Sequence, residues 1–183
     1  MKLHRSDLGH RPVAVRILVG LLVFLGITAI GGGLAMLGGI EGAAPPEEWL
    51  ADIPIVDSWV VPGLVLTLVF GLGSLLAAYG VFRRPHWGWM RPVENATRHH
   101  WSETAAVALG LGQVAWIGLE VVYLDGLSWL MPFYGSVGLA IALSAVAPGT
   151  RGYLALPISV VHVGAAQEGA AADGLRRTEE PRR

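Results

Sequence analysis

The sequence predicts an all-α fold, a polytopic bundle of four transmembrane helices with both termini in the cytoplasm. Its composition indicates a membrane protein, because 53% of the 183 residues are hydrophobic and only 15% are charged. Soluble domains carry roughly 25% charged residues. The apolar residues also gather in four long segments, and nearly all of the charged residues lie between or outside them.

Each apolar segment is long enough to cross roughly 30 Å of hydrocarbon as a helix. The four predicted helices cover residues 17–40, 60–82, 104–124 and 127–147, within a membrane domain at 17–148. The first segment exceeds the length of a signal-peptide core, so we expect it to be retained. Three consecutive glycines at 31–33 favour either close packing or a local loosening of this helix.

The charges predict the orientation of the helices. All thirteen Lys and Arg residues fall before the first helix, between the second and third, or after the fourth. The two remaining loops hold only acidic charges. The positive-inside rule therefore places residues 1–16 and 149–183 in the cytoplasm, with the chain in the cell (inner) membrane. The tail is polar from residue 167 onward and is expected to be disordered at its end.

The composition predicts that the partners of this chain lie in the membrane. Small residues recur three or four positions apart, as at Ala106 and Gly110 or at Gly138 and Ala142. This spacing lets transmembrane helices approach closely. The lipid bilayer is the first partner, and a homo-oligomer or a larger membrane complex is the second. The basic residues are scattered, so no nucleic-acid partner is predicted.

Two polar residues interrupt the third predicted helix. Gln113 and Glu120 are seven residues apart and so lie on nearly the same face. A carboxylate near the bilayer centre costs about 2.5–3.5 kcal/mol, and less toward the surface. Glu120 is therefore either a packing residue that hydrogen-bonds a neighbour or reaches the headgroups, or a protonatable group facing a cavity. Its candidate partners are Thr67, Tyr123, Tyr134 and Ser136, and Gln113 is interpreted as a packing residue.

Histidines and a glutamate precede the third helix. His99 and Glu103 are four residues apart and would share a helix face, with His100 beside them and with His86 able to approach from the preceding loop. Zinc sites use such ligands, but the spacing matches no established motif, so no metal site is predicted. The chain has no cysteine, which excludes disulfides, iron–sulfur clusters and thiol catalysis. The sequence leaves the cofactor, and any residues that would bind one, unknown.

Three stretches carry a resemblance to a known group of proteins. They are "PGLVLTLVFGLGSLLAAYGVFRR", "GQVAWIGLEVVYL" and "SWLMPFYGSVGLAIALSA". Together they resemble a group of small four-helix integral membrane proteins of bacteria over residues 13–148. That group has no assigned activity, so the resemblance implies architecture and not mechanism. It also implies that one shared feature of the third and fourth helices contains Trp116, Glu120, Pro132, Tyr134 and Gly138.

Three functions remain open from the sequence. The favoured one is a membrane protein without catalytic apparatus, acting as an interaction or accessory subunit or as a lipid-binding bundle. The second is an oligomeric carrier or channel subunit that uses Glu120 as a protonatable intramembrane group. The third is a membrane enzyme or quinone-binding subunit that uses His99, His100 and Glu103.

Overall fold

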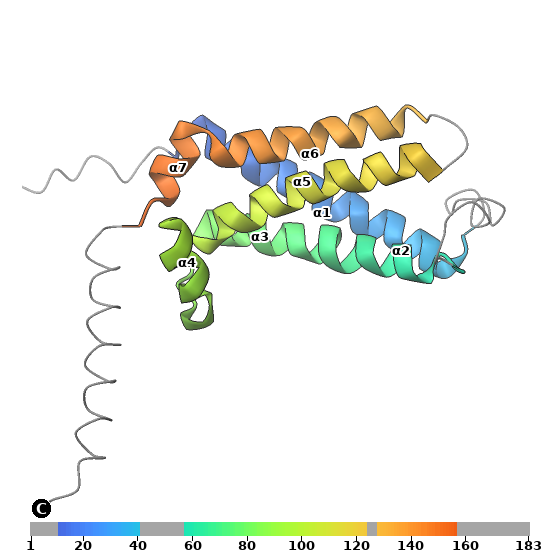
Figure 1. Ribbon diagram of the computed structural model, residues 1–183, viewed down its shortest axis with the longest axis horizontal. Helices are drawn as coiled ribbons and strands as arrows, with labels where there is room; N and C mark the ends of the chain where they lie inside the picture. Colours follow the sequence, from blue (N-terminus) through green and yellow to red (C-terminus); the bar gives the residue numbers. More distant parts are fainter. Residues whose placement is uncertain (1–10, 41–56, 124–127, 157–183) are drawn as a thin grey trace, which may run out of the picture.

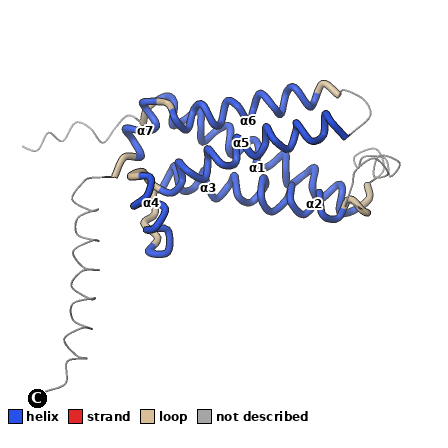
Figure 2. The backbone as a smooth tube through the Cα atoms, in the orientation of Figure 1, coloured by secondary structure: helices blue, strands red, loops and turns tan. Residues whose placement is uncertain are grey.

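The computed structural model describes residues 11–40, 57–123 and 128–156, and within these ranges the chain is helical and has no β-strand (Figure 2). The all-α prediction is confirmed. Four helical rods lie side by side (Figure 1). They are α1 (Val13–Gly38), the rod of α2 (Val60–Val65), η2 (Leu66–Leu72) and α3 (Gly73–Arg83), α5 (Trp101–Tyr123), and α6 (Leu130–Val146). The shorter η3 (Gly88–Met90), α4 (Arg91–Thr97) and α7 (Pro148–Leu154) lie at one end of the rods.

The outside of the bundle is apolar. Along α1, Leu18 and Leu22 are fully buried, whereas Ile17 and Ile27 expose 50% and 61% of their surface. The other rods likewise expose large aliphatic side chains. Contiguous apolar surface on this scale is rare on soluble monomers and is expected on a surface that faces lipid.

Three helices are long and apolar enough to cross a membrane: Val13–Gly38, Val60–Arg83 and Trp101–Tyr123. The helix α6 has 17 residues, roughly 26 Å of rise, which is at the lower limit for a span. Together with α7, which follows it at an angle of 57°, α6 is a fourth candidate for a membrane span. The bend occurs at Ala147, because a residue before proline is forced into an extended conformation. The protein is thus a helical, membrane-embedded protein.

Glycines bring α1 close to the second rod. A Cβ atom on Gly33 would lie 2.6 Å from the carbonyl oxygen of Gly63, and one on Gly71 would lie 2.5 Å from the side chain of Ile30. At this contact the second rod is a π-helix over Leu66–Leu72, which includes Gly71. Such a local widening is rare in helices. The helix α1 itself continues through residues 31–33 without a break. Gly33 serves close packing there, whereas a Cβ atom on Gly31 would meet nothing within 4 Å.

The rods α5 and α6 meet through small residues near the middle of α5. A Cβ atom on Gly110 would lie 2.6 Å from the carbonyl oxygen of Gly138 and 2.7 Å from the amide nitrogen of Ala142. All buried residues of α5 lie between Trp101 and Gln113. Residues 114–123, which we call the open half of α5, include no buried residue within the described part of the chain.

The helix ends differ modestly from the expected segments. The helix α1 begins at Val13, four residues before the expected start at 17, and α5 begins at Trp101, three residues before 104. The helix α1 ends where Gly39 takes a left-handed conformation (φ 58°), and the backbone N–H groups of Gly39 and Ile40 donate to carbonyl oxygens of the last turn. The expected disorder at the end of the tail lies outside the described residues.

Candidate functional site

Polar residues gather at the end of the bundle where α4 and α7 lie. Two left-handed residues, Arg84 (φ 51°) and Arg98 (φ 59°), end α3 and α4 and turn the chain sharply. The backbone N–H of His100 then donates to the carbonyl oxygen of Leu154 (3.0 Å). This contact joins the start of α5 to the last residue of α7. We call the polar residues assembled here the end cluster: His86, Glu94, His99, His100, Ser102, Glu103 and Arg151.

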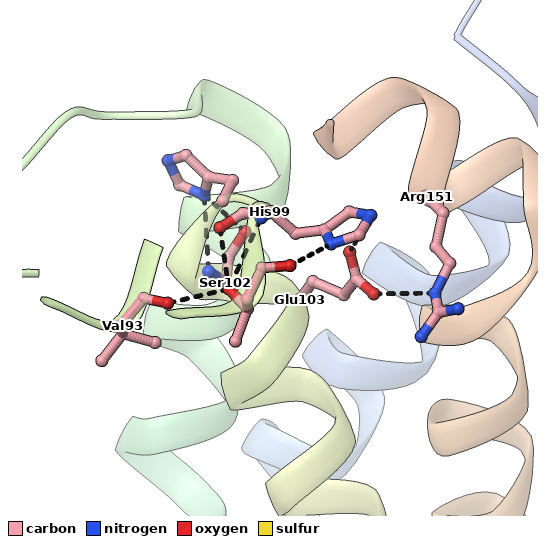
Figure 3. A network of polar contacts seen from close by, with 7 residues as sticks. Val93, His99, Ser102, Glu103 and Arg151 are labelled. Carbon is pink, nitrogen blue, oxygen red and sulfur yellow. Dashed lines mark hydrogen bonds and ion pairs between the residues drawn. The ribbon is translucent and has the colours of Figure 1, made fainter. Parts of the chain in front are cut away.

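One part of the end cluster is centred on the Glu103 carboxylate, which is buried (5% exposed). The guanidinium Nε of Arg151, on α7, donates to Oε1 of Glu103 at 3.1 Å, and the His99 Nε2 lies 3.8 Å from Oε2 (Figure 3). The sequence predicted that His99 and Glu103 would share a helix face, and the two side chains do lie close together. The sequence did not predict Arg151, which is 48 positions away.

The other part of the end cluster surrounds His100, whose side chain is fully buried. Its Nδ1 lies 2.8 Å from Ser102 Oγ, its Nε2 lies 3.1 Å from the carbonyl oxygen of Pro85, and Glu94 Oε1 is 3.9 Å from the same Nε2. Burial lowers the pKa of His100 below its usual 6.5, although the hydrogen bond to Pro85 and the charge of Glu94 act in the opposite direction. The neutral imidazole is therefore favoured.

A serine, a histidine and a carboxylate in contact are also the parts of a nucleophile–base pair with an orienting acid. Here Ser102 and His100 are both fully buried, and Glu94 is only 6% exposed. A substrate has no access to Ser102 Oγ in this arrangement. The hydrogen bonds therefore stabilise the start of α5 and are not arranged for attack on a substrate.

From the sequence, the weak candidates for metal ligands were His99, His100 and Glu103. Their side chains do not form one group. Glu103 faces His99 and the positively charged Arg151, whereas His100 faces Glu94. A cation beside Glu103 would be repelled by the Arg151 guanidinium. The ring of His86 lies 5.9 Å from that of His100. The sequence offered His86 as a residue able to approach His99 and Glu103, but Glu94 was not singled out, because positions 86, 94 and 100 follow no regular spacing.

Glu120 has a hydrogen-bond partner on its own helix. The indole Nε1 of Trp116 donates to Glu120 Oε1 at 2.6 Å, and both side chains are half-buried. Among the described residues, Glu120 makes no hydrogen bond to the candidate partners named from the sequence. Trp116 and Glu120 both belong to the open half of α5, near its end at Tyr123.

Gln113 and the remaining residues of the predicted feature of the third and fourth helices face different neighbours. Gln113 is buried (3% exposed) against Gly138, and its Oε1 has no hydrogen-bond partner among the described residues. Trp116 packs edge-on against Phe70 of η2, whereas Tyr134 stacks against Phe24 of α1.

Pro132 contributes its carbonyl oxygen, which accepts a hydrogen bond from Ser136 Oγ at 2.7 Å. That bond lies within α6 and satisfies the serine hydroxyl locally.

Comparisons of the chain with family models, with curated proteins and with solved structures find no match.

Proposed function

We propose that this chain is an integral membrane protein of four spans that acts as an interaction or accessory subunit and has no catalytic role of its own. The fourth span in this proposal is α6, which with α7 is long enough to count as one. The partner in this proposal is a transmembrane helix of another subunit, either a second copy of the chain or a different membrane protein.

The observation that carries the proposal is the change in burial along α5. The face that packs inward at Leu109 and Gln113 continues, at helical spacing, to Trp116 and Glu120. In the open half of α5 that face is only partly covered by the described residues. A carboxyl group in an apolar span is costly unless it is hydrogen-bonded.

Glu120 has one oxygen that accepts from Trp116 and a second that makes no hydrogen bond among the described residues. A helix of another subunit would cover this face and supply a donor to the second oxygen. Lipid tails have no hydrogen-bond donors, so association of helices within the bilayer uses such groups. This argument favours a protein partner at this position over lipid.

The arginines support an orientation with both termini in the cytoplasm. The guanidinium of Arg11 lies 3.7 Å from the centre of the Phe82 ring, and that of Arg84 lies 4.9 Å from the Tyr153 ring. These contacts place a basic residue from just before α1 and one from just after α3 at the same end of the bundle, against aromatic rings of α3 and α7. Under the positive-inside rule, that end faces the cytoplasm of the cell (inner) membrane.

Photo-crosslinking in the native membrane tests the proposal. A benzophenone amino acid replaces Tyr123, in the open half of α5 (37% exposed), and in a control chain it replaces Tyr79 on α3 (49% exposed). We expect the chain labelled at Tyr123 to give a product of defined larger mass, and the Tyr79 control to give little. Equal yields from the two positions, or a Tyr123 product formed only within its own chain or with lipid, would refute the proposal.

A further inference from the structure

We propose that His86, Glu94 and His100 bind a divalent transition-metal ion of the Zn²⁺ class. The three residues come from separate parts of the chain: the loop after α3, the helix α4 and the junction before α5. Their ligand atoms all lie within 4.8 Å of one another. The inference does not depend on the partner proposed for the open half of α5.

The spacing of the ligand atoms is close to that of a metal site. Zinc bonds to imidazole nitrogen and carboxylate oxygen are about 2.0–2.2 Å long, so two ligands of a tetrahedral ion lie roughly 3.4 Å apart. His100 Nε2 and Glu94 Oε1 are 3.9 Å apart. Side-chain movements on the order of 1 Å bring the atoms to the required distances. His86 is exposed and has the freedom to make such a movement.

The type of ligand selects the class of ion. Two imidazole nitrogens and one carboxylate oxygen suit zinc and its neighbours, whereas magnesium and calcium prefer oxygen ligands. Neutral imidazole is the form that binds a metal, and burial favours that form for His100. Three protein ligands leave the fourth position of a tetrahedral ion to water or to a small exogenous ligand.

The surroundings hold the ligands in place as in known metal sites, where a ligating histidine hydrogen-bonds through its other nitrogen. The Nδ1 of His100 lies 2.8 Å from Ser102 Oγ, and a hydroxyl group can accept from it. The backbone N–H of Trp101 donates to Glu94 Oε1 at 3.4 Å.

A bound ion would also change one hydrogen bond of the cluster. His100 Nε2 would release the carbonyl oxygen of Pro85, to which it is now 3.1 Å distant. The indole Nε1 of Trp101 lies 3.3 Å from the same oxygen and keeps it hydrogen-bonded. No buried carbonyl group is therefore left without a donor when the ion binds.

The charges near His86, Glu94 and His100 are compatible with a bound cation. The Glu94 carboxylate supplies a negative charge, and it is buried beside His100. The nearby guanidinium of Arg84 lies over the Tyr153 ring, and that of Arg151 pairs with Glu103. The exposed side of His86 provides a path for an ion from solvent.

Zinc titration of the full chain in detergent tests the site. The protein is purified through a tag without histidine, with His4, His10 and His162 changed to Ala, so that His86, His99 and His100 are the only histidines present. It is stripped with a chelator and titrated with Zn²⁺ against a chromophoric zinc indicator. We expect one Zn²⁺ per chain, and visible d–d bands of a tetrahedral ion when Co²⁺ is used in its place.

Two variants should lower the affinity without unfolding the protein. His86→Ala changes an exposed side chain, and Glu94→Gln keeps an oxygen that accepts from Trp101. Each should weaken Zn²⁺ binding by at least about 100-fold, since even supporting residues of metal sites cost 10–100-fold. The control, His99→Ala, changes a neighbouring histidine outside the group and should leave the affinity unchanged.

Two results would overturn the proposal. One is the absence of stoichiometric Zn²⁺ binding to the chain that keeps His86, Glu94 and His100. The other is an equal loss of affinity in His99→Ala and His86→Ala, which would show binding by scattered surface histidines. Circular dichroism of each variant confirms that the helices are intact, so a loss of binding reports on the ligands themselves.

Discussion

The two halves of α5 have different surroundings, and the half that packs less closely is the more apolar of the two. From Trp101 to Gln113 the helix buries residues against the second rod and α6, and Gly110 touches the backbone of α6. In the open half, a Cβ atom on Gly118 would meet nothing within 4 Å. Hydropathy is therefore a poor guide to which part of a membrane helix packs. Close contact depends on small residues on both facing helices.

The two carboxylates of α5 show the same difference. Glu103, in the packed half, has the charged Arg151 as its partner and is almost fully buried. Glu120, in the open half, has only the neutral N–H of Trp116 and is half-buried. A charged partner near the bundle end stabilises an ionised carboxylate, whereas a single indole N–H does much less. Glu120 is therefore the residue for which a further partner matters most.

The largest expected difference in stability is between two Gly→Ala variants, one in each half of α5. Gly110→Ala would place its Cβ 2.6 Å from the carbonyl oxygen of Gly138, so α5 and α6 would have to separate. We expect a loss of about 2–3 kcal/mol of unfolding free energy, as for overpacked cores. Gly118→Ala should be neutral or slightly stabilising, because Ala is the better helix former. Thermal unfolding in detergent measures both, and equal effects would contradict the comparison.

A smaller effect is expected at the ion pair of the packed half. Arg151→Ala leaves the buried Glu103 carboxylate without its cation and should cost about 1–2 kcal/mol, since Arg151 is itself half-exposed. Adding Glu103→Gln removes the unpaired charge, so the double variant should regain part of the loss. Denaturant unfolding of the two single variants and the double variant measures the coupling. A double variant that is less stable than Arg151→Ala would argue against the ion pair.

The smallest effect is expected for Glu120→Gln. Glutamine keeps an oxygen that accepts from Trp116 Nε1, so the stability should change by less than about 0.5 kcal/mol. Thermal unfolding measures this change, and a failure to fold would reveal a missing ionic partner. The same variant separates the carrier hypothesis from the interaction hypothesis. Loss of a proton-coupled transport activity in a correctly folded Glu120→Gln protein would favour the carrier.

Much of the fold was predictable because membrane spans are long and their apolar character is continuous. The chain positions of the four rods follow from hydropathy, and the extended Ala147 follows from Pro148. The π-helix over Leu66–Leu72 was not predicted, since it carries no proline and lies opposite glycines of a different helix. A feature of this kind depends on a contact between helices, which the local sequence does not contain.

The end cluster was predictable only where its residues are neighbours in the chain. The pair of His99 and Glu103 follows from helical spacing, but the partner Arg151 is brought in by the fold of α7. The grouping of His86 with His100 depends on the left-handed turn at Arg84. Arginine rarely adopts that conformation, so the left-handed geometry of this turn is not evident from the sequence.

The most direct test of the account is native mass spectrometry of the wild-type chain, extracted gently from its own membranes. A single chain has a mass of 19.4 kDa. The account predicts a larger species, either a multiple of this mass or this mass plus that of another membrane protein, because a second subunit covers the open half of α5. A single chain at 19.4 kDa with no associated protein would contradict it.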